Sequence, residues 1–251
     1  MQDVMQFDLN TYVKLDEKVL AALVTAETTD VTDPSVAFLR SYIFDGCFGL
    51  TDGIDKKTAF QEAVLGMKVK DTLCTAKVAV MLAVGSGTAR DIRQADKLSR
   101  ACIEDLEVLA QQGNPYAKCI AGLLYGFGIG MRDKVKGFNY FLSASEQGEP
   151  IAQNNLANCY IDGIGTGIDL KQAKRWAMAS AYSNYPYGHF TIAQLLEKEG
   201  DLQGAVEHYE KAGEQGYVSA MVHAAEYYAF RESPDLQKAF EWFKKASDHG
   251  E

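Results

Sequence analysis

The chain has 251 residues, of which 47% are hydrophobic and 24% charged, a composition typical of a globular protein and unlike that of a disordered chain. The net charge is -9 at pH 7 and no cluster of Lys and Arg stands out, which argues against nucleic acid or an anionic membrane as the partner. No apolar run approaches the roughly 18 residues that span a bilayer, so membrane insertion is not expected.

The N-terminal part of the chain differs from the rest. Residues 1–33 are predicted to form a helical cap, because Leu20, Leu23 and Val24 supply the apolar side of an amphipathic segment. Residues 34–251 are predicted to form a solenoid of about six helix pairs. A degenerate first pair is expected at 35–70, since Gly-Ile-Asp-Lys-Lys-Thr-Ala at 53–59 is close to Gly-Ile-Asp-Leu-Lys-Gln-Ala at 167–173.

An internal repeat is the main pattern of the chain. Segment 113–130 returns 35 residues later as 148–165, with Gly, Pro, Ala, Tyr, Gly, Ile and Gly at the same places. Pro115, Pro150 and Pro186 keep this period, and proline suits the first turn of a helix, where its missing amide is not needed. Such a period predicts stacked units that each contact mainly their neighbours.

Glycines precede several of these helix starts and predict where the previous helix ends. Gly113, Gly148 and Gly216 occupy this position, and Asn184 stands where the next glycine would fall. Glycine and, after it, asparagine are the residues that most readily adopt the left-handed backbone conformation at a helix end. We therefore expect Asn184 to be left-handed too.

Each unit reads as two helices. The first helix carries small or apolar residues on one face, so that a neighbour can approach closely, as at Ala117, Ala121, Gly122 and Tyr125. The second helix opens on a small residue and places bulky groups three and four positions on, as at Ala205, His208 and Tyr209. Two departures are expected: a longer second helix at 94–112, and no Gly-x-Gly loop in the last two units.

These units resemble Sel-1-like repeats, the longer relatives of tetratricopeptide repeats. The resemblance rests on the Ala…Tyr…Gly-x-Gly strings of 117–130 and 152–165 and on the strings that end at a glycine in 136–148, 204–216 and 238–250. It is clear over residues 76–251. It implies an all-α fold, namely a right-handed superhelical solenoid of antiparallel helix pairs.

Signatures of catalysis and of metal binding are missing from the sequence. The loops 126–130 and 163–167 resemble phosphate-binding loops, but they follow a helix at the same phase of each repeat, which indicates turns between helices. The four histidines never stand three to five residues apart, and neither Cys-x-x-Cys nor Gly-x-Ser-x-Gly occurs. We therefore predict a protein that is not an enzyme and holds no cofactor and no metal.

The cysteines bear on the compartment. The chain has five, an odd number without a repeated pair spacing, so a disulfide framework is not expected and most thiols are predicted to be buried. The first residues also lack the basic and apolar stretches of a signal peptide. A cytoplasmic location is predicted, with export as an effector without a classical signal peptide as the alternative.

The resemblance also implies a binding surface. In tetratricopeptide-type solenoids, outward positions of the first helices line a concave groove that receives an extended peptide or a helix. Asn154 and Asn158 lie one turn apart and could hold a peptide amide, although both could be solvated positions without a ligand. The aromatic positions are either partner anchors or packing groups. Carried over by position, the candidates are Tyr116, Leu123, Phe127, Asn154, Asn158, Asp162, Tyr187, Phe190, Gln194 and Glu226.

The charges near this surface bear on the partner. Asp162, Glu197 and Glu226 favour a basic or apolar protein segment over an acidic one. A clamp for a carboxylate would need cations beside the asparagines, and only Lys118 and Lys198 are near. The leading hypothesis is therefore a scaffold or adaptor that binds a peptide or helix of a partner.

Two other functions are kept as alternatives. One is a bacterial effector or regulator that docks on a folded partner through its loops. The other is a cell-wall-ligand-binding or hydrolytic protein, which would be expected to show export and disulfide signals. The last unit also ends at 250–251 without a capping helix, which predicts either a dimer through this unit or a trimmed end.

Overall fold

The computed structural model describes residues 33–46 and 54–249, so the predicted cap at 1–33, except for Asp33, and the segment around Gly53 lie outside the described residues. The described residues form helices and no strands. The helices pair in sequence order, which agrees with the predicted α-solenoid. Their bounds are α2 (Pro34–Phe44), α3 (Lys56–Lys68), α4 (Thr72–Val84), α5 (Ile92–Gln111), α6 (Pro115–Phe127), α7 (Lys134–Ser145), α8 (Pro150–Asp162), α9 (Leu170–Tyr182), α10 (Pro186–Glu199), α11 (Leu202–Glu214), α12 (Val218–Phe230) and α13 (Leu236–His249).

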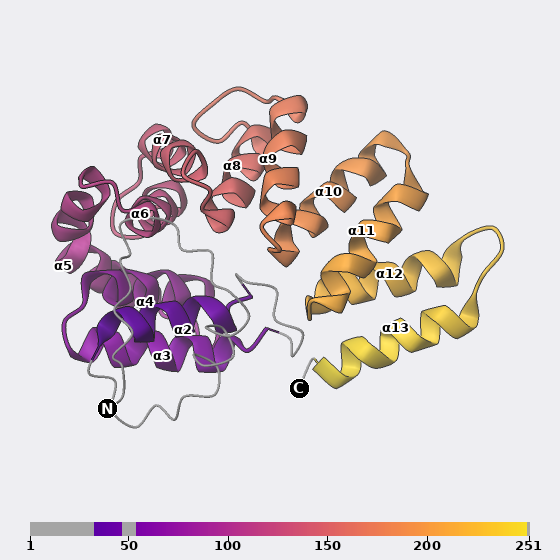
Figure 1. Cartoon of the computed structure of the whole chain (residues 1–251), viewed down its shortest axis with the longest axis horizontal. Helices are drawn as coiled ribbons and strands as arrows, with labels where there is room; N and C mark the ends of the chain where they lie inside the picture. Colours follow the sequence, from indigo (N-terminus) through magenta and orange to yellow (C-terminus); the bar gives the residue numbers. More distant parts are fainter. Residues whose placement is uncertain (1–32, 47–53, 250–251) are drawn as a thin grey trace, which may run out of the picture.

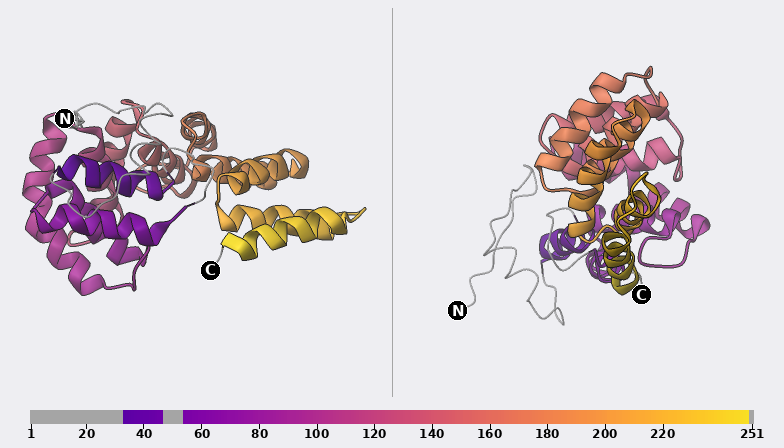
Figure 2. Two further views of the ribbon diagram at one scale, coloured as in Figure 1. Left: turned by 60° about the horizontal axis from the view of Figure 1, so that its bottom comes forward. Right: turned by 90° about the vertical axis from the view of Figure 1, so that its right-hand side faces the viewer.

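The pairs follow an arch (Figures 1 and 2). Each helix packs on the helix before and after it, and the first helices of successive pairs also contact one another, α4 with α6, α6 with α8 and α8 with α10. The first helices therefore line one side of the array. The arch curves back on itself, so that α3 of the first pair lies close to α10 of the fifth pair. Here Lys56 Nζ donates to the Tyr187 hydroxyl over 2.7 Å.

The predicted helix starts and ends are confirmed. Proline occupies the first position of α2, α6, α8 and α10. Gly113, Gly148 and Gly216 have φ of 101°, 90° and 85°, and Asn184 has φ of 61°. Asparagine therefore takes the left-handed conformation at the place where the other units carry glycine, as expected for the next most tolerant residue.

Small residues on the first helices form the core. Ala117, Ala121, Ala152 and Ala157 are completely buried, and Gly122 is buried with them. A Cβ added to Gly122 would lie 2.6 Å from the ring of Phe141 on the paired helix, so only glycine allows this approach. The small side chains predicted from the repeat thus set the distance between the helices.

A hydrogen-bonded link recurs between neighbouring units. In one case Glu107 on α5 accepts from the Tyr125 hydroxyl on α6 over 2.7 Å. In the other, Glu210 on α11 accepts from the Tyr228 hydroxyl on α12 over 3.0 Å and from Trp242 Nε1 on α13 over 3.3 Å. The acid stands at the same place of the second helix in both units, and it ties that helix to the next unit.

Both predicted departures from regularity are present. Helix α5 has 20 residues, against 12 to 14 in the other second helices from α7 onward. The connection between α10 and α11 is only residues 200–201. The buried apolar residues fall into three clusters, a large one on α2–α8, a small one that joins α8, α9 and α10, and one on α10–α13. The last two units therefore have a core of their own and are joined to the earlier units through α10.

The cysteines agree with the prediction where they are described. Cys74, Cys102, Cys119 and Cys159 are buried and form no disulfide, while Cys47 lies outside the described residues. Burial raises the pKa of the Cys102 and Cys159 thiols to about 11, so both stay protonated near neutral pH. These four thiols are packing groups.

Candidate functional site

A groove of about 460 Å³ opens between α8 and α10, on the side lined by the first helices. Asn158 and Asp162 reach it from α8, and Gln194 reaches it from α10. These are three of the predicted binding residues, and they come from neighbouring units at equivalent faces. The remaining lining residues are Ile161, Leu195, Glu197 and Lys198.

The groove combines amides with a negative charge. Asn158 and Gln194 each offer a side-chain donor and acceptor, which suits the hydrogen bonding of a peptide backbone. Asp162 and Glu197 add two carboxylates against the single ammonium of Lys198. Glu197 is also held in place, because its carboxylate accepts from the Tyr209 hydroxyl over 2.7 Å. The groove is therefore polar, acidic and partly preorganised.

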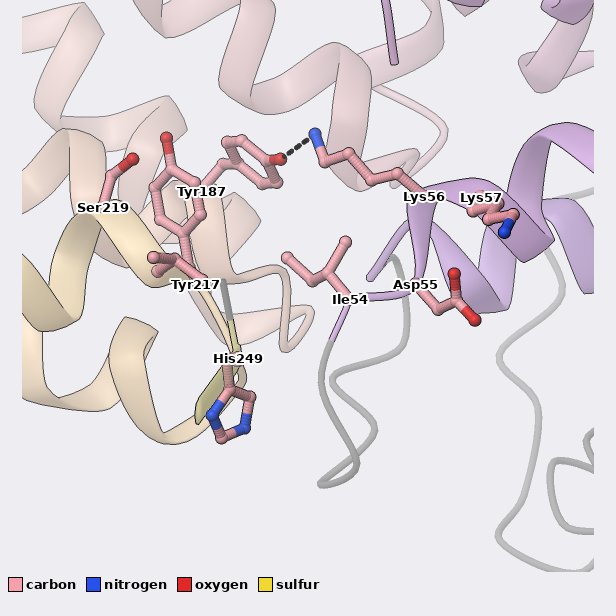
Figure 3. Close-up of a pocket in the computed structure, with 10 residues that line it drawn as sticks. Ile54, Asp55, Lys56, Lys57, Tyr187, Tyr217, Ser219 and His249 are labelled. Atoms are coloured by element: carbon pink, nitrogen blue, oxygen red, sulfur yellow. Dashed lines mark hydrogen bonds between the residues drawn. The ribbon is translucent and has the colours of Figure 1, made fainter. Parts of the chain in front are cut away.

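A second hollow, of about 740 Å³, lies where the two ends of the arch approach (Figure 3). Tyr187 forms one wall; its ring stacks on Tyr185 with centroids 5.0 Å apart and makes a tilted contact with Tyr217 at 4.4 Å. Lys56 and His249 come to this hollow from opposite ends of the chain. The sequence pattern could not predict it, since the repeat reports on neighbouring units and not on units four apart.

Three predicted groove residues lie in the packing instead. Tyr116 is completely buried, with its ring 5.3 Å from Phe38 and 5.2 Å from Tyr42 in edge-to-face contacts. Asn154 is buried and accepts from the Thr191 hydroxyl over 2.9 Å, so it links α8 to α10. The expectation that these two face a partner is wrong, because the tight curvature presses the first helices together.

The third of these residues is Phe190. It is half-buried in an aromatic cluster with Tyr209, Tyr217 and His223, at centroid distances of 5.0 to 5.5 Å. The cluster ties α10 to α11 and α12. Phe190 is therefore a packing group between units, and its replacement would disturb the fold together with any binding surface.

The other predicted residues are partly or fully accessible. Leu123 is half-buried and lines a small cavity of about 70 Å³ beside Tyr42 and Tyr185. Phe127 on α6 is 59% exposed. Glu226 on α12 is exposed and stands 3.9 Å from His223. Together with Tyr187, whose hydroxyl accepts from Lys56, these residues lie away from the α8–α10 groove.

A pair of histidines joins α10 and α11. His189 on α10 and His208 on α11 have their Nδ1 atoms 3.0 Å apart, so one ring donates to the other, and the two rings cannot both be protonated on Nδ1. Burial, together with the charge that His208 would carry, lowers the pKa of His189 to about 4. Burial also lowers the pKa of His208, so the folded chain favours the neutral form of both rings.

This pair predicts a pH dependence of stability. The unfolded chain binds a proton at His189 near its ordinary pKa of about 6.5, whereas the folded chain does so only near 4. The contribution of neutral His189 to the free energy of unfolding is therefore fully present above pH 6.5 and is lost as the pH falls toward 4. Because the ring is partly exposed, we expect a loss of about 1 kcal/mol, or roughly 3 °C in Tm, between pH 7.5 and 5.0.

Thermal unfolding followed by circular dichroism at the two pH values checks this expectation. The His189→Gln variant lacks the titrating group, and its Tm should fall less than that of the natural chain over the same interval. Equal falls in both proteins would mean that His189 is not held neutral by the fold.

The described residues contain no group of three His, Cys, Asp or Glu side chains that could hold a metal ion. Within the same residues no helix combines the length and the hydropathy needed to cross a membrane. The geometry that is present is a curved array of helix pairs with a polar groove on its inner side, and this defines a repeat protein of the α-solenoid class.

Comparison with known proteins identifies the family. Residues 73–95, 115–149, 150–184, 195–217 and 218–251 match the model of the Sel1 repeat. The matches cover more than half of the chain, so the protein belongs to the Sel1 repeat family. Sel1 repeat proteins generally mediate protein–protein interactions and are generally scaffolds without enzymatic activity.

Individual relatives are distant. The chain is 25% identical over 100 residues to a putative Sel1-like repeat-containing protein of Acanthamoeba polyphaga mimivirus, a match that spans 40% of this chain and 19% of the viral protein. Its fold resembles that of a Sel1 repeat protein from Oxalobacter formigenes, with a TM-score of 0.56, 21% identity and coverage of 91% of this chain and 93% of the other.

It also resembles a protective antigen of uropathogenic Escherichia coli, with a TM-score of 0.54 and 21% identity. That likeness covers 87% of this chain and 47% of the antigen, so the chain spans about half of the antigen's length. At these identities the likeness to both solved structures concerns the fold.

Proposed function

We propose that this chain is a non-enzymatic scaffold that binds an extended segment of a partner protein in the groove between α8 and α10. The observation that carries the proposal is the convergence of Asn158 and Gln194, from neighbouring repeats, on one groove. Two amides on successive first helices match the alternating donors and acceptors of an extended backbone. The family's general role in protein–protein interaction supports the same function.

The charges of the groove favour a particular partner. Asp162 and Glu197 outnumber Lys198, and Ile161 and Leu195 supply the apolar part of the lining. A segment that carries a Lys or Arg beside an apolar residue complements both features, and an acidic segment is disfavoured. The partner is therefore proposed to be a basic-apolar peptide stretch.

The groove is tested by a paired substitution, Asn158→Ala with Gln194→Ala. Each amide is expected to contribute about 1 kcal/mol to binding, so the double variant should weaken capture of the partner by about tenfold to thirtyfold. The measurement is affinity capture from extract of the native cells with quantitative mass spectrometry, followed by titration of the captured segment. Neither side chain is fully buried, so the helical circular dichroism should be unchanged.

A matched control is Gln111→Ala, which removes an exposed amide at the end of α5, outside the groove lining. It should capture the partner as the natural chain does. Equal capture by the double variant would contradict the groove proposal and would favour docking of a folded partner on another surface.

A further inference from the structure

The last described helix, α13, exposes aromatic side chains at places that earlier repeats bury. Phe240 is 64% exposed and Phe243 is 42% exposed. One repeat earlier, on α11, the equivalent residues Val206 and Tyr209 are 1% and 2% exposed. Burying two aromatic side chains is worth several kcal/mol, so this face of α13 is suited to a contact surface.

The comparison with α11 also indicates what does not fit there. Helix α12 covers α11, with Met221 against Gly213 and the Tyr228 hydroxyl bonded to Glu210. On α13 the residue in the place of Glu210 is Lys244. Lysine has no acceptor for a tyrosine hydroxyl. A covering helix of the same kind as α12 could therefore not form the tyrosine–glutamate hydrogen bond seen on α11. The positive charge of Lys244 favours a partner with a negative charge opposite it.

α13 carries such a negative charge itself, at Glu241. The spacing of its outward side chains is the same in either chain direction, as an antiparallel pair of identical helices requires. Its apolar row has the spacing four, three, four, and the polar row beside it has the same spacing one residue further on. In an antiparallel second copy, Phe240 of each chain lies opposite Phe243 of the other. In this register Glu241 lies two residues, about 3 Å along the helix axis, from the position directly opposite Lys244, a distance that the two long side chains can span. The apolar row is Leu236, Phe240 and Phe243, with Ser247 as the small residue at its end, and the polar row is Gln237, Glu241, Lys244 and Asp248.

We propose that the outward face of α13 binds the same face of a second copy of this chain, with the two helices antiparallel. The apolar rows pack at the centre and the two Glu241–Lys244 pairs lie at one flank. The contact is independent of the α8–α10 groove, which lies on other helices and stays open in each copy. A single helix–helix contact buries a small area, so a dissociation constant on the order of 10 µM is expected.

Sedimentation equilibrium of the chain from about 5 to 500 µM tests the proposal. The natural protein should pass from monomer to dimer over this range. Phe240→Glu should abolish the dimer, because it places carboxylates in the apolar centre, whereas Tyr182→Glu, at an exposed aromatic residue on α9, should leave it intact. A natural chain that stays monomeric at about 500 µM, or a dimer that survives Phe240→Glu, would overturn the proposal.

Charge exchange tests the antiparallel arrangement without touching the apolar row. Glu241→Lys and Lys244→Glu should each weaken self-association at least tenfold, since like charges then face each other. The variant with both changes should regain the natural affinity, and an equimolar mixture of the two single variants should form a heterodimer. Weakened single variants that recover neither by combination nor by mixing would contradict this pairing.

Discussion

Replacement of Glu62 by alanine is expected to lower the free energy of unfolding by about 3–5 kcal/mol. Glu62 on α3 forms an ion pair with Arg40 on α2 over 3.0 Å, and their side chains are 4% and 5% exposed. Removal of the carboxylate leaves the guanidinium charge in a site from which water is largely excluded. The loss of this buried ion pair then weakens the contact between the first two helices.

The double variant Arg40→Met with Glu62→Leu separates the cost of breaking the ion pair from the loss of packing. It removes both charges while keeping most of the volume, so its stability should lie within about 1 kcal/mol of the natural protein. Urea unfolding followed by circular dichroism measures both variants. A loss below about 1 kcal/mol for Glu62→Ala would contradict the expected contribution of this ion pair to stability.

The loss should also be local. In a repeat array each unit interacts mainly with its neighbours, so a defect in the first pair is expected to open α2 and α3 before the rest. Hydrogen exchange should therefore rise in 34–44 and 56–68 and stay unchanged in α11 and α12. Fluorescence of Trp176 and Trp242 would not report this opening, because both lie in later units.

A second large effect is expected at Gly165, in the loop between α8 and α9. Its φ is 73°, and a Cβ placed there would overlap the carbonyl oxygen of Lys134 and lie 2.8 Å from Phe138 Cβ on the preceding unit. Gly165→Ala should therefore destabilise the protein by about 3 kcal/mol or more, from the left-handed backbone and the clash together.

Gly167, two residues further along the same loop, is the control. A Cβ there would meet no atom within 4 Å, so Gly167→Ala should change stability by less than about 0.5 kcal/mol. Chemical denaturation of the two variants side by side measures the difference. Equal stabilities would mean that the loop can move away from α7 at little cost.

This glycine also shows how far the loops could be interpreted from the sequence. Their recurrence at a constant phase predicted turns between helices, and the structure confirms this, since Gly163 ends α8 in the left-handed conformation. The contact of Gly165 with Lys134 could not be predicted from the loop alone. It depends on how the preceding unit is placed, which is a property of the stacked array.

The candidate site could be predicted only in part, for the same reason. Position along the first helices predicts that Asn158 and Gln194 face the groove, and both line it. The same positions in the repeat also predict Tyr116 and Asn154, which are buried. Position on a helix predicts the direction of a side chain, whereas its exposure depends on how closely the next helix approaches.

The sequence alone determined the helical repeat, the places where helices begin and end, and the small residues at which helices meet. These features depend on contacts within a unit and between neighbouring units, and the residues that make these contacts recur in successive repeats. Only the tertiary structure decided the curvature of the array. That curvature brings Lys56 to Tyr187 and presses Tyr116 into the core, because small rotations between successive units add up over the chain, and no single repeat encodes their sum.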